Sequence, residues 1–190
     1  MHDFTVRRWK FLELSEEAQE VAIENYTRVL DETLDSEMVN DILEDALISE
    51  LGAMPKDLLI EFSLSYSQGD GVAFYGNIEK EEAPLLTWGE DIKKLALERT
   101  SLSGFYSHYN TFAVEAYNED EEEIPFDRFN EDLTTITEQL RDISKRLEKV
   151  GYEFIGENCG VEHAAECLIE EDAAVFLEDG RRSEPVGVVE

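Results

Sequence analysis

The segment that decides the fold runs from residue 58 to residue 75: Leu58-Leu-Ile-Glu-Phe-Ser-Leu-Ser-Tyr66-Ser-Gln-Gly-Asp-Gly-Val-Ala-Phe-Tyr75. Over residues 58–66, apolar side chains alternate with acidic and hydroxyl side chains, which predicts a strand with one solvated face. Residues 68–71, Gln-Gly-Asp-Gly, are typical of a tight turn, and residues 72–75 return as a second strand. The sequence therefore predicts an antiparallel hairpin.

On both sides of this hairpin, the spacing of apolar residues predicts helices and further strands. Ser15 is the expected N-cap of a helix whose first turn is acidic. A second helix is predicted over residues 36–51. A long helix is predicted over residues 126–150, because apolar side chains recur every three or four residues until Gly151. The other predicted elements are strands over 4–11 and 174–177, helices over 88–98 and 159–171, and a hairpin of 105–109 with 111–117.

The predicted order is β-α-α-β-β-α-β-β-α-α-β, and no linker rich in Pro, Gly or Ser divides it. We therefore predict a single α+β domain over residues 1–180, with an antiparallel sheet of hairpins and helices packed on one face. Residues 181–190 are predicted to fray as a tail.

The composition is strongly acidic. The chain has 190 residues, of which 46 are Asp or Glu and 16 are Lys or Arg, so its formal net charge is −30. Such a surface repels phosphate groups, and we expect no direct binding to nucleic acid or to anionic membranes. The sequence has no membrane-spanning apolar run and no secretory signal, so we expect a cytoplasmic protein with Cys159 and Cys167 reduced.

Two segments carry acidic residues with few bases nearby. Residues 31–51 contain eight acidic residues and no Lys or Arg, and residues 119–150 contain eleven acidic residues against five bases. Like charges three or four residues apart on a helix repel each other, and a surface that needs only solubility would intersperse lysines. The side chains predicted to contact a partner are Asp31, Asp35, Asp41, Glu44, Asp45, Glu119, Asp120, Glu121, Glu122, Glu123, Asp127 and Glu131.

Nucleic acid carries charges at a comparable spacing. A duplex has one negative charge per roughly 1.7 Å of axis, and a helix rises about 1.5 Å per residue. The hypothesis is therefore a nucleic-acid mimic that occupies the basic groove of a nucleic-acid-binding protein. It predicts that both acidic segments form one continuous strip. The alternatives are an acidic surface that is merely solvated, or one adapted to high salt.

Motifs for catalysis and metal binding are weak. The glycine-flanked residues 69–71 fit a hairpin turn better than a phosphate-binding loop. Cys159, His163 and Cys167 recur every four residues, but zinc would need a fourth ligand, so packing is the favoured interpretation. His108 lies among aromatic residues without an evident nucleophile. We predict no enzymatic activity, no catalytic residues, no metal and no cofactor.

Three stretches carry a resemblance to known proteins. They are residues 11–18 (Phe-x-Glu-Leu-Ser-Glu-Glu-Ala), 62–74 (Phe-Ser-Leu-Ser-Tyr-Ser-Gln-Gly-Asp-Gly-Val-Ala-Phe) and 176–180 (Phe-Leu-Glu-Asp-Gly). In these stretches the chain resembles a widespread group of small phage- and prophage-encoded proteins, most of which lack an assigned function. The resemblance implies a phage origin. By analogy with acidic anti-CRISPR and anti-restriction proteins, it implies inhibition of a host defence protein, a CRISPR effector or restriction nuclease.

A rival hypothesis is a regulatory or antitoxin-like module that binds a protein through apolar groups, with the charge serving only solubility. Trp9, Trp88, Tyr106 and Tyr109 would then form the contact surface. A small hydrolase is a third hypothesis, and it lacks an evident base and nucleophile.

Overall fold

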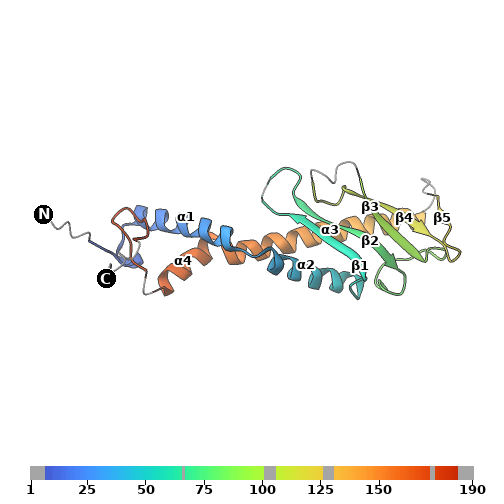
Figure 1. The fold of residues 1–190 in the computed structure, drawn as a ribbon, viewed down its shortest axis with the longest axis horizontal. Coiled ribbons are helices and arrows are strands. Elements are labelled where there is room, and N and C mark those ends of the chain that lie inside the picture. The colour runs from blue at the N-terminus through green and yellow to red at the C-terminus, as the bar shows by residue number, and fades with distance from the viewer. Residues whose placement is uncertain (1–6, 66, 101–105, 126–130, 172–173, 184–190) are drawn as a thin grey trace, which may run out of the picture. The chain divides into compact units, whose positions relative to one another are not determined.

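The computed structural model describes residues 7–65, 67–100, 106–125, 131–171 and 174–183 (Figure 1). The chain clusters into two compact units, which are described separately below. The sheet unit spans residues 36–154, and the helical unit combines residues 1–35 with residues 155–190. Whether residues 1–180 behave as one domain stays a prediction.

The described residues of the sheet unit include an antiparallel five-stranded sheet. Strand order across the sheet equals chain order, so each strand pairs with its neighbour in sequence. The predicted hairpin of residues 58–75 is confirmed, with Ile60 opposite Phe74. The strands are β1 (Asp57–Ser63), β2 (Gly71–Glu79), β3 (Lys94–Arg99), β4 (Phe112–Tyr117) and β5 (Glu123–Ile124).

Asp70 organises the turn of this hairpin. Its carboxylate accepts hydrogen bonds from the backbone N–H groups of Ser65 (2.7 Å) and Ser67 (2.6 Å) and from the hydroxyl of Ser63 (2.7 Å). Desolvation acts to raise the pKa of Asp70, but these hydrogen bonds together hold the pKa below its ordinary value. Gly69 and Asp70 therefore lie in the turn, as predicted, whereas Gly71 already begins β2 and pairs with Ser63, where β1 ends.

Helices α2 (Ser36–Leu51) and α3 (Glu131–Cys159) supply the apolar layer on one face of this sheet. The bounds of α2 match the predicted helix, and both helices turn a stripe of leucine and isoleucine inward. The sheet contributes Phe74 and Phe112 to this buried layer, and the centroids of their two rings lie 5.2 Å from each other. The α+β class, with an antiparallel sheet and helices on one face, is confirmed. The buried helix residues include Leu43, Leu47, Leu51, Leu133, Ile136, Leu140, Ile143 and Leu147.

The helical unit is built on α1 (Glu16–Thr33) and α4 (Val161–Glu170), preceded by η1 (Phe11–Glu13), a single 3-10 turn. The Oγ of Ser15 accepts a hydrogen bond from the N–H of Ala18, so the predicted N-cap is confirmed. The buried core of this unit consists of Phe11, Leu14, Ala18, Ala22, Leu168, Ala174 and Phe176.

The strands predicted over residues 4–11 and 174–177 are wrong in the residues that the structure describes. Phe176 forms isolated bridges with Trp9 and Arg182, and η1 begins directly after Lys10, so pairing stops after single residues. Residues 4–6 and most of the predicted tail, 184–190, lie outside the described residues.

The short helix predicted over residues 88–98 is also wrong, because this segment leads into β3. Leu95 and Leu97 are buried and alternate with half-buried or exposed residues, and β3 pairs with both β2 and β4. Two ladders of hydrogen bonds outweigh the local helix preference of this segment. The partner of β4 is therefore β3, and not residues 105–109, of which 105 lies outside the described residues.

The long helix does not end at Gly151 as predicted, but continues to Cys159. A Cβ atom on Gly151 would lie 2.4 Å from Cδ1 of Leu64, so this glycine serves close packing rather than helix termination. The predicted helix start, residues 126–130, lies outside the described residues.

Candidate functional site

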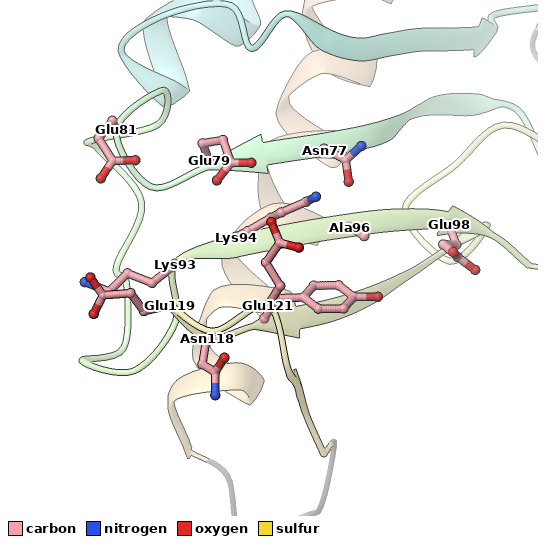
Figure 2. A pocket seen from close by; sticks show the side chains of 11 residues that line it. Asn77, Glu79, Glu81, Lys93, Lys94, Ala96, Glu98, Asn118, Glu119 and Glu121 are labelled. Carbon is pink, nitrogen blue, oxygen red and sulfur yellow. The ribbon is translucent and has the colours of Figure 1, made fainter.

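A hollow of about 550 Å³ opens on the face of the sheet opposite to α2 and α3 (Figure 2). We call it the sheet-face hollow. Its lining includes five glutamates and two lysines, which gives a net charge of −3 from those side chains. The lining residues are Asn77, Glu79, Glu81, Lys93, Lys94, Ala96, Glu98, Tyr117, Asn118, Glu119 and Glu121.

Strand alternation explains why these side chains share one face. Ile78 and Leu95 are fully buried on the helix side, so the residues on either side of them point to the opposite face. Glu79 lies opposite Lys94 across the β2–β3 pair, and Lys94 lies opposite Tyr117 across the β3–β4 pair. The strand register thus places Lys94 between Glu79 on β2 and Tyr117 on β4.

Tyr117 is the aromatic residue of the hollow. Its hydroxyl donates a hydrogen bond to Oε2 of Glu115 at 2.8 Å, and Nζ of Lys94 lies 5.9 Å from its ring centroid. The hydrogen bond to Glu115 raises the pKa of Tyr117 above 10.0, and desolvation and nearby glutamates act in the same direction. The neutral hydroxyl of Tyr117 is therefore favoured first by its hydrogen bond to Glu115.

Asn118 holds the loop between β4 and β5 at one end of the hollow. Its Oδ1 accepts hydrogen bonds from the backbone N–H groups of Asp120 and Glu122, both at 2.9 Å. Within this loop Glu121 has φ of 60°, in the left-handed region that residues with a side chain rarely adopt. This loop brings Glu119 and Glu121 to the hollow, as Figure 2 shows.

The hollow joins predicted and unpredicted residues. Of the predicted contact residues it includes Glu119 and Glu121, and it adds Glu79, Glu81 and Glu98, which lie outside the two acidic segments of the sequence. The alternation of buried and exposed residues around Ile78 indicates that Glu79 lies on the outer face of a strand. The position of Glu98 could not be predicted, because its segment was wrongly predicted to be a helix. The remaining predicted residues of this segment are exposed beside the hollow (Asp120, Glu122, Glu123), exposed at the start of α3 (Glu131), or outside the described residues (Asp127).

The second acidic region is the outer surface of α2. We define the α2 acidic face as Asp41, Glu44 and Asp45. Asp41 and Asp45 are exposed, whereas Glu44 is half-buried and accepts a hydrogen bond from Nδ2 of Asn40 at 2.6 Å. In the described part of the chain, none of these three carboxylates forms an ion pair.

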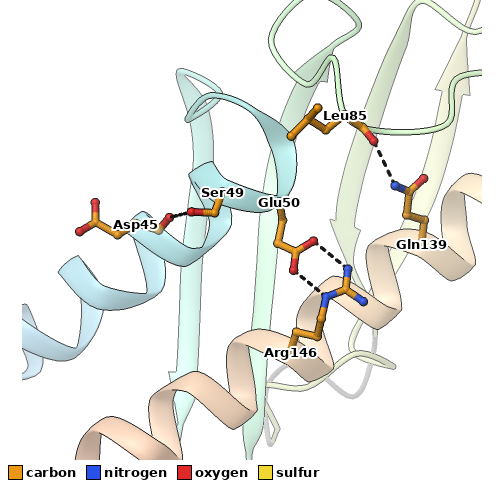
Figure 3. Close-up of polar contacts among 6 residues, drawn as sticks. All are labelled: Asp45, Ser49, Glu50, Leu85, Gln139 and Arg146. Atoms are coloured by element: carbon orange, nitrogen blue, oxygen red, sulfur yellow. Dashed lines mark hydrogen bonds and ion pairs between the residues drawn. The ribbon is translucent and has the colours of Figure 1, made fainter.

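Farther along the same helix, Glu50 is tied to α3 (Figure 3). Its carboxylate accepts hydrogen bonds from Nε and Nη2 of Arg146 at 2.6 and 2.8 Å. These hydrogen bonds lower the pKa of Glu50 below 4.5, although desolvation opposes them. Glu50 thus contributes to the packing of the two helices, and the acidity of α2 is concentrated in its earlier turns.

The expected continuous acidic strip is not formed within the sheet unit. The α2 acidic face lies on the helix side of the sheet, whereas Glu119 and Glu121 line the hollow on the other side. Asp31 and Asp35 belong to the helical unit. There Asp31 lies near Cys159, and the pKa of that thiol is raised by burial first and by Asp31 second. The sheet therefore separates the two acidic regions.

The side chains considered for metal binding and catalysis have local partners. Sγ of Cys167 lies 3.4 Å from Nε2 of His163, and Nδ1 of His108 accepts a hydrogen bond from the N–H of Asn110 at 3.1 Å. Among the described residues, no group of three His, Cys, Asp or Glu is placed to hold a metal ion. The absence of enzymatic activity and of a cofactor stays a prediction.

Comparisons of the chain with protein-family models, curated proteins and solved structures found no match. The resemblance to phage-encoded proteins therefore stays a prediction. None of the helices within the described residues combines the length and the apolar run that a membrane crossing requires.

Proposed function

We propose that this protein is a non-enzymatic mimic of nucleic acid that occupies the basic groove of a nucleic-acid-binding protein through the sheet-face hollow. One observation carries the proposal: glutamates from β2, β3 and two loops converge on one concave surface that contains only two lysines. Lys and Arg side chains that bind phosphate also bind carboxylate, Arg in the same bidentate geometry. A groove selected for nucleic acid would therefore accept this surface.

The hollow supports this role better than the α2 acidic face does. A concave surface lined by one sign of charge focuses the electric field, whereas the exposed outer surface of a helix disperses it into solvent. Neighbouring strands lie about 4.8 Å apart and same-face residues about 6.8 Å apart along a strand, so the sheet spreads charge in two dimensions. A basic groove that contacts both strands of a duplex has its own charges spread in two dimensions.

The net charge of −30 supports rapid encounter with such a partner. Long-range attraction between opposite charges raises association rates, and salt weakens it within about 8 Å at physiological ionic strength. By the resemblance to phage-encoded proteins, the proposed target is a host defence protein in the host cytoplasm, a CRISPR effector or a restriction nuclease.

The rival regulatory or antitoxin-like function has weaker support. Nε1 of Trp88 donates a hydrogen bond to the carbonyl oxygen of Ala83 at 2.8 Å. The guanidinium of Arg7 stacks on Trp9, with its Cζ 4.0 Å from the centroid of the indole ring. Both indole rings thus have partners within the chain, which makes them less suited to anchor another protein.

The test begins with capture. The immobilised protein is exposed to lysates of bacteria that carry restriction or CRISPR systems, and bound proteins are identified by mass spectrometry. The captured protein is then purified and loaded with a fluorescent DNA duplex or its guide RNA. We expect the protein to displace the nucleic acid, with a displacement that weakens steeply as salt rises.

Two triple variants with the same change in charge locate the surface. One reverses the hollow (Glu79→Lys, Glu98→Lys and Glu121→Lys), and the other reverses the α2 acidic face (Asp41→Lys, Glu44→Lys and Asp45→Lys). We expect displacement to be lost only in the hollow variant, on the order of a hundredfold in affinity. Displacement that is independent of salt, or that survives hollow reversal, contradicts the proposal. Loss only on Tyr106→Ala or Tyr109→Ala supports the rival function.

A further inference from the structure

The outer edge of β1 is open. β1 is an end strand of the sheet, and no strand in the described residues pairs with its outer side. The N–H of Leu58 donates to the carbonyl oxygen of Pro55 at 3.3 Å, so the N–H and C=O groups of Leu58 point away from β2. Because backbone direction alternates along an antiparallel ladder, Ile60 and Phe62 also direct their N–H and C=O groups toward this edge. An added strand would find hydrogen-bonding groups there.

A groove accompanies this edge, between β1 and the first turns of α2. Its volume is about 360 Å³, and Ser36, Glu37, Asn40, Asp41 and Phe62 line it. The ring of Phe62 supplies an apolar wall, and Glu37 and Asp41 supply carboxylates. A Lys or Arg side chain suits such a groove, since its aliphatic stem packs on apolar surface while its charged head reaches an acidic group.

The opposite face of β1 presents Leu59 and Glu61, and the carboxylate of Glu61 already accepts hydrogen bonds from Arg99. Leu59 is 66% exposed there. Side chains of a strand alternate between the two faces of a sheet, so an added strand would direct every second side chain toward α2 and the others toward Leu59. The matching sequence alternates cationic residues with aliphatic ones.

We propose that the outer edge of β1 is a docking site for an extended segment of a partner protein, in which Lys or Arg faces α2 and aliphatic residues cover Leu59. The segment joins the sheet as an additional strand, a known mode of peptide recognition. This surface is separate from the sheet-face hollow, and the inference does not rest on the proposed function.

A second copy of this chain is the other occupant that an open strand edge admits. Self-association would bring together two molecules that each carry a net charge of −30, and their repulsion opposes it. A cationic segment replaces this repulsion with attraction. Charge complementarity therefore favours a different protein over a second copy.

The experiment uses the whole protein and a fluorescent peptide of alternating lysine and valine with the length of β1. The matched control peptide has the same sequence and charge, but its amides that would face β1 are N-methylated and cannot donate. We expect N-methylation to weaken binding at least about tenfold in fluorescence anisotropy, because several backbone hydrogen bonds are lost. We also expect the unmodified peptide to slow amide hydrogen exchange at Ile60 and Phe62. Equal affinity for both peptides overturns the proposal, since binding would then be charge attraction alone.

Two single variants test the groove with the same change in charge. Asp41 lines the groove, whereas Asp45, one turn along the same helix, does not. We expect Asp41→Lys to weaken the unmodified peptide about tenfold and Asp45→Lys by less than about threefold. Equal losses overturn the proposal, as does a dimer in light scattering whose formation protects Ile60 and Phe62. The hollow variant should keep its sensitivity to N-methylation, so failure of the proposed function leaves this test intact.

Discussion

The sheet-face hollow and the α2 acidic face carry the same kind of charge, but their construction differs. The α2 acidic face comes from one helix, and the regular geometry of that helix determines the position of each carboxylate. The hollow gathers glutamates from separate segments, and it depends on strand register and on a loop in which Glu121 has a left-handed backbone. A count of charges along the sequence can therefore predict the α2 acidic face. The hollow, in contrast, exists only once the strands have paired.

The largest effect is expected from a substitution in the backbone of β2, which forms part of the hollow. Gly76 has φ of 126°, and a Cβ atom there would lie 1.9 Å from the carbonyl oxygen of Asp57. We expect Gly76→Ala to lower the free energy of unfolding by about 2–4 kcal/mol, because the backbone of β1 or β2 must shift. Urea unfolding followed by circular dichroism measures the change.

A second glycine provides the matched control for this substitution. A Cβ atom on Gly156 in α3 would meet no atom within 4 Å. We expect Gly156→Ala to stabilise the protein by about 0.5–1 kcal/mol, since alanine favours the helix. If Gly76→Ala were as stable as the unmodified protein, β2 would tolerate a side chain at residue 76, and the register of the hollow would not depend on this glycine.

The next effect concerns the loop at the end of the hollow. Asn118→Ala removes two hydrogen bonds from its Oδ1 to backbone N–H groups. We expect a loss of about 1–2 kcal/mol in the free energy of unfolding, together with faster amide exchange at Asp120 and Glu122. Asn118→Asp keeps an acceptor oxygen and should restore the slow exchange. If Asn118→Ala leaves exchange unchanged, the loop does not depend on this side chain.

A smaller effect is expected on the α2 side. Arg146→Ala removes the partner of Glu50, whose folded pKa lies below the unfolded value of 4.5. The stabilisation from this pair is therefore present above about pH 4.5 and is lost as the pH falls through the folded pKa. Because 50% of the Arg146 side chain is exposed, water screens the pair, and we expect a loss of about 0.5–1 kcal/mol at neutral pH.

Acid titration of unfolding checks this prediction. The difference between Arg146→Ala and the unmodified protein should shrink as the pH falls below 4.5. Lys145→Ala is the control, because it removes the ion pair with Asp142, which lies within α3 and involves no residue of α2. A difference that persists in acid would indicate that Arg146 stabilises the protein through packing rather than through its charge.

The smallest effect leaves stability aside and concerns the hydroxyl of Tyr117, the aromatic residue of the hollow. Glu115 accepts the hydrogen bond from the hydroxyl of Tyr117 and is the first cause of its raised pKa. We expect Glu115→Gln to move this pKa back toward 10.0, as measured by ultraviolet titration of tyrosinate. Glu81→Gln, which lines the hollow but is not among the causes of the raised pKa, should leave it nearly unchanged. Equal shifts in both variants would mean that general charge, and not this hydrogen bond, sets the pKa.

The sequence predicted elements whose pattern is local. The hairpin of β1 and β2, the bounds of α2 and the N-cap Ser15 depend on alternation, helical spacing and capping within a few residues of each other. β3 was missed because its residues favour a helix locally, and only the ladders on both sides make it a strand. Gly151 was misinterpreted for a related reason: the contact that explains it comes from Leu64, far away in the sequence.

The candidate site follows the same division. Glu119 and Glu121 were predicted because they belong to an acidic run, and the structure places them at the hollow. Glu79 and Glu98 were not predicted, since each stands alone in its own strand and gains acidic neighbours only through pairing. The separation of the two acidic regions by the sheet was likewise invisible to a count of charges along the chain.

Strand order also bears on how the chain folds. In the described sheet every strand pairs with its neighbour in sequence, so each pairing closes only a short loop. Short loops lose little conformational entropy on closure, and proteins dominated by contacts between nearby residues fold fast. We expect the sheet to form hairpin by hairpin, with the turn at Asp70 as an early step. Helices α2 and α3 precede and follow the sheet in the chain, so their packing against each other would close the largest loop of the unit and complete its folding.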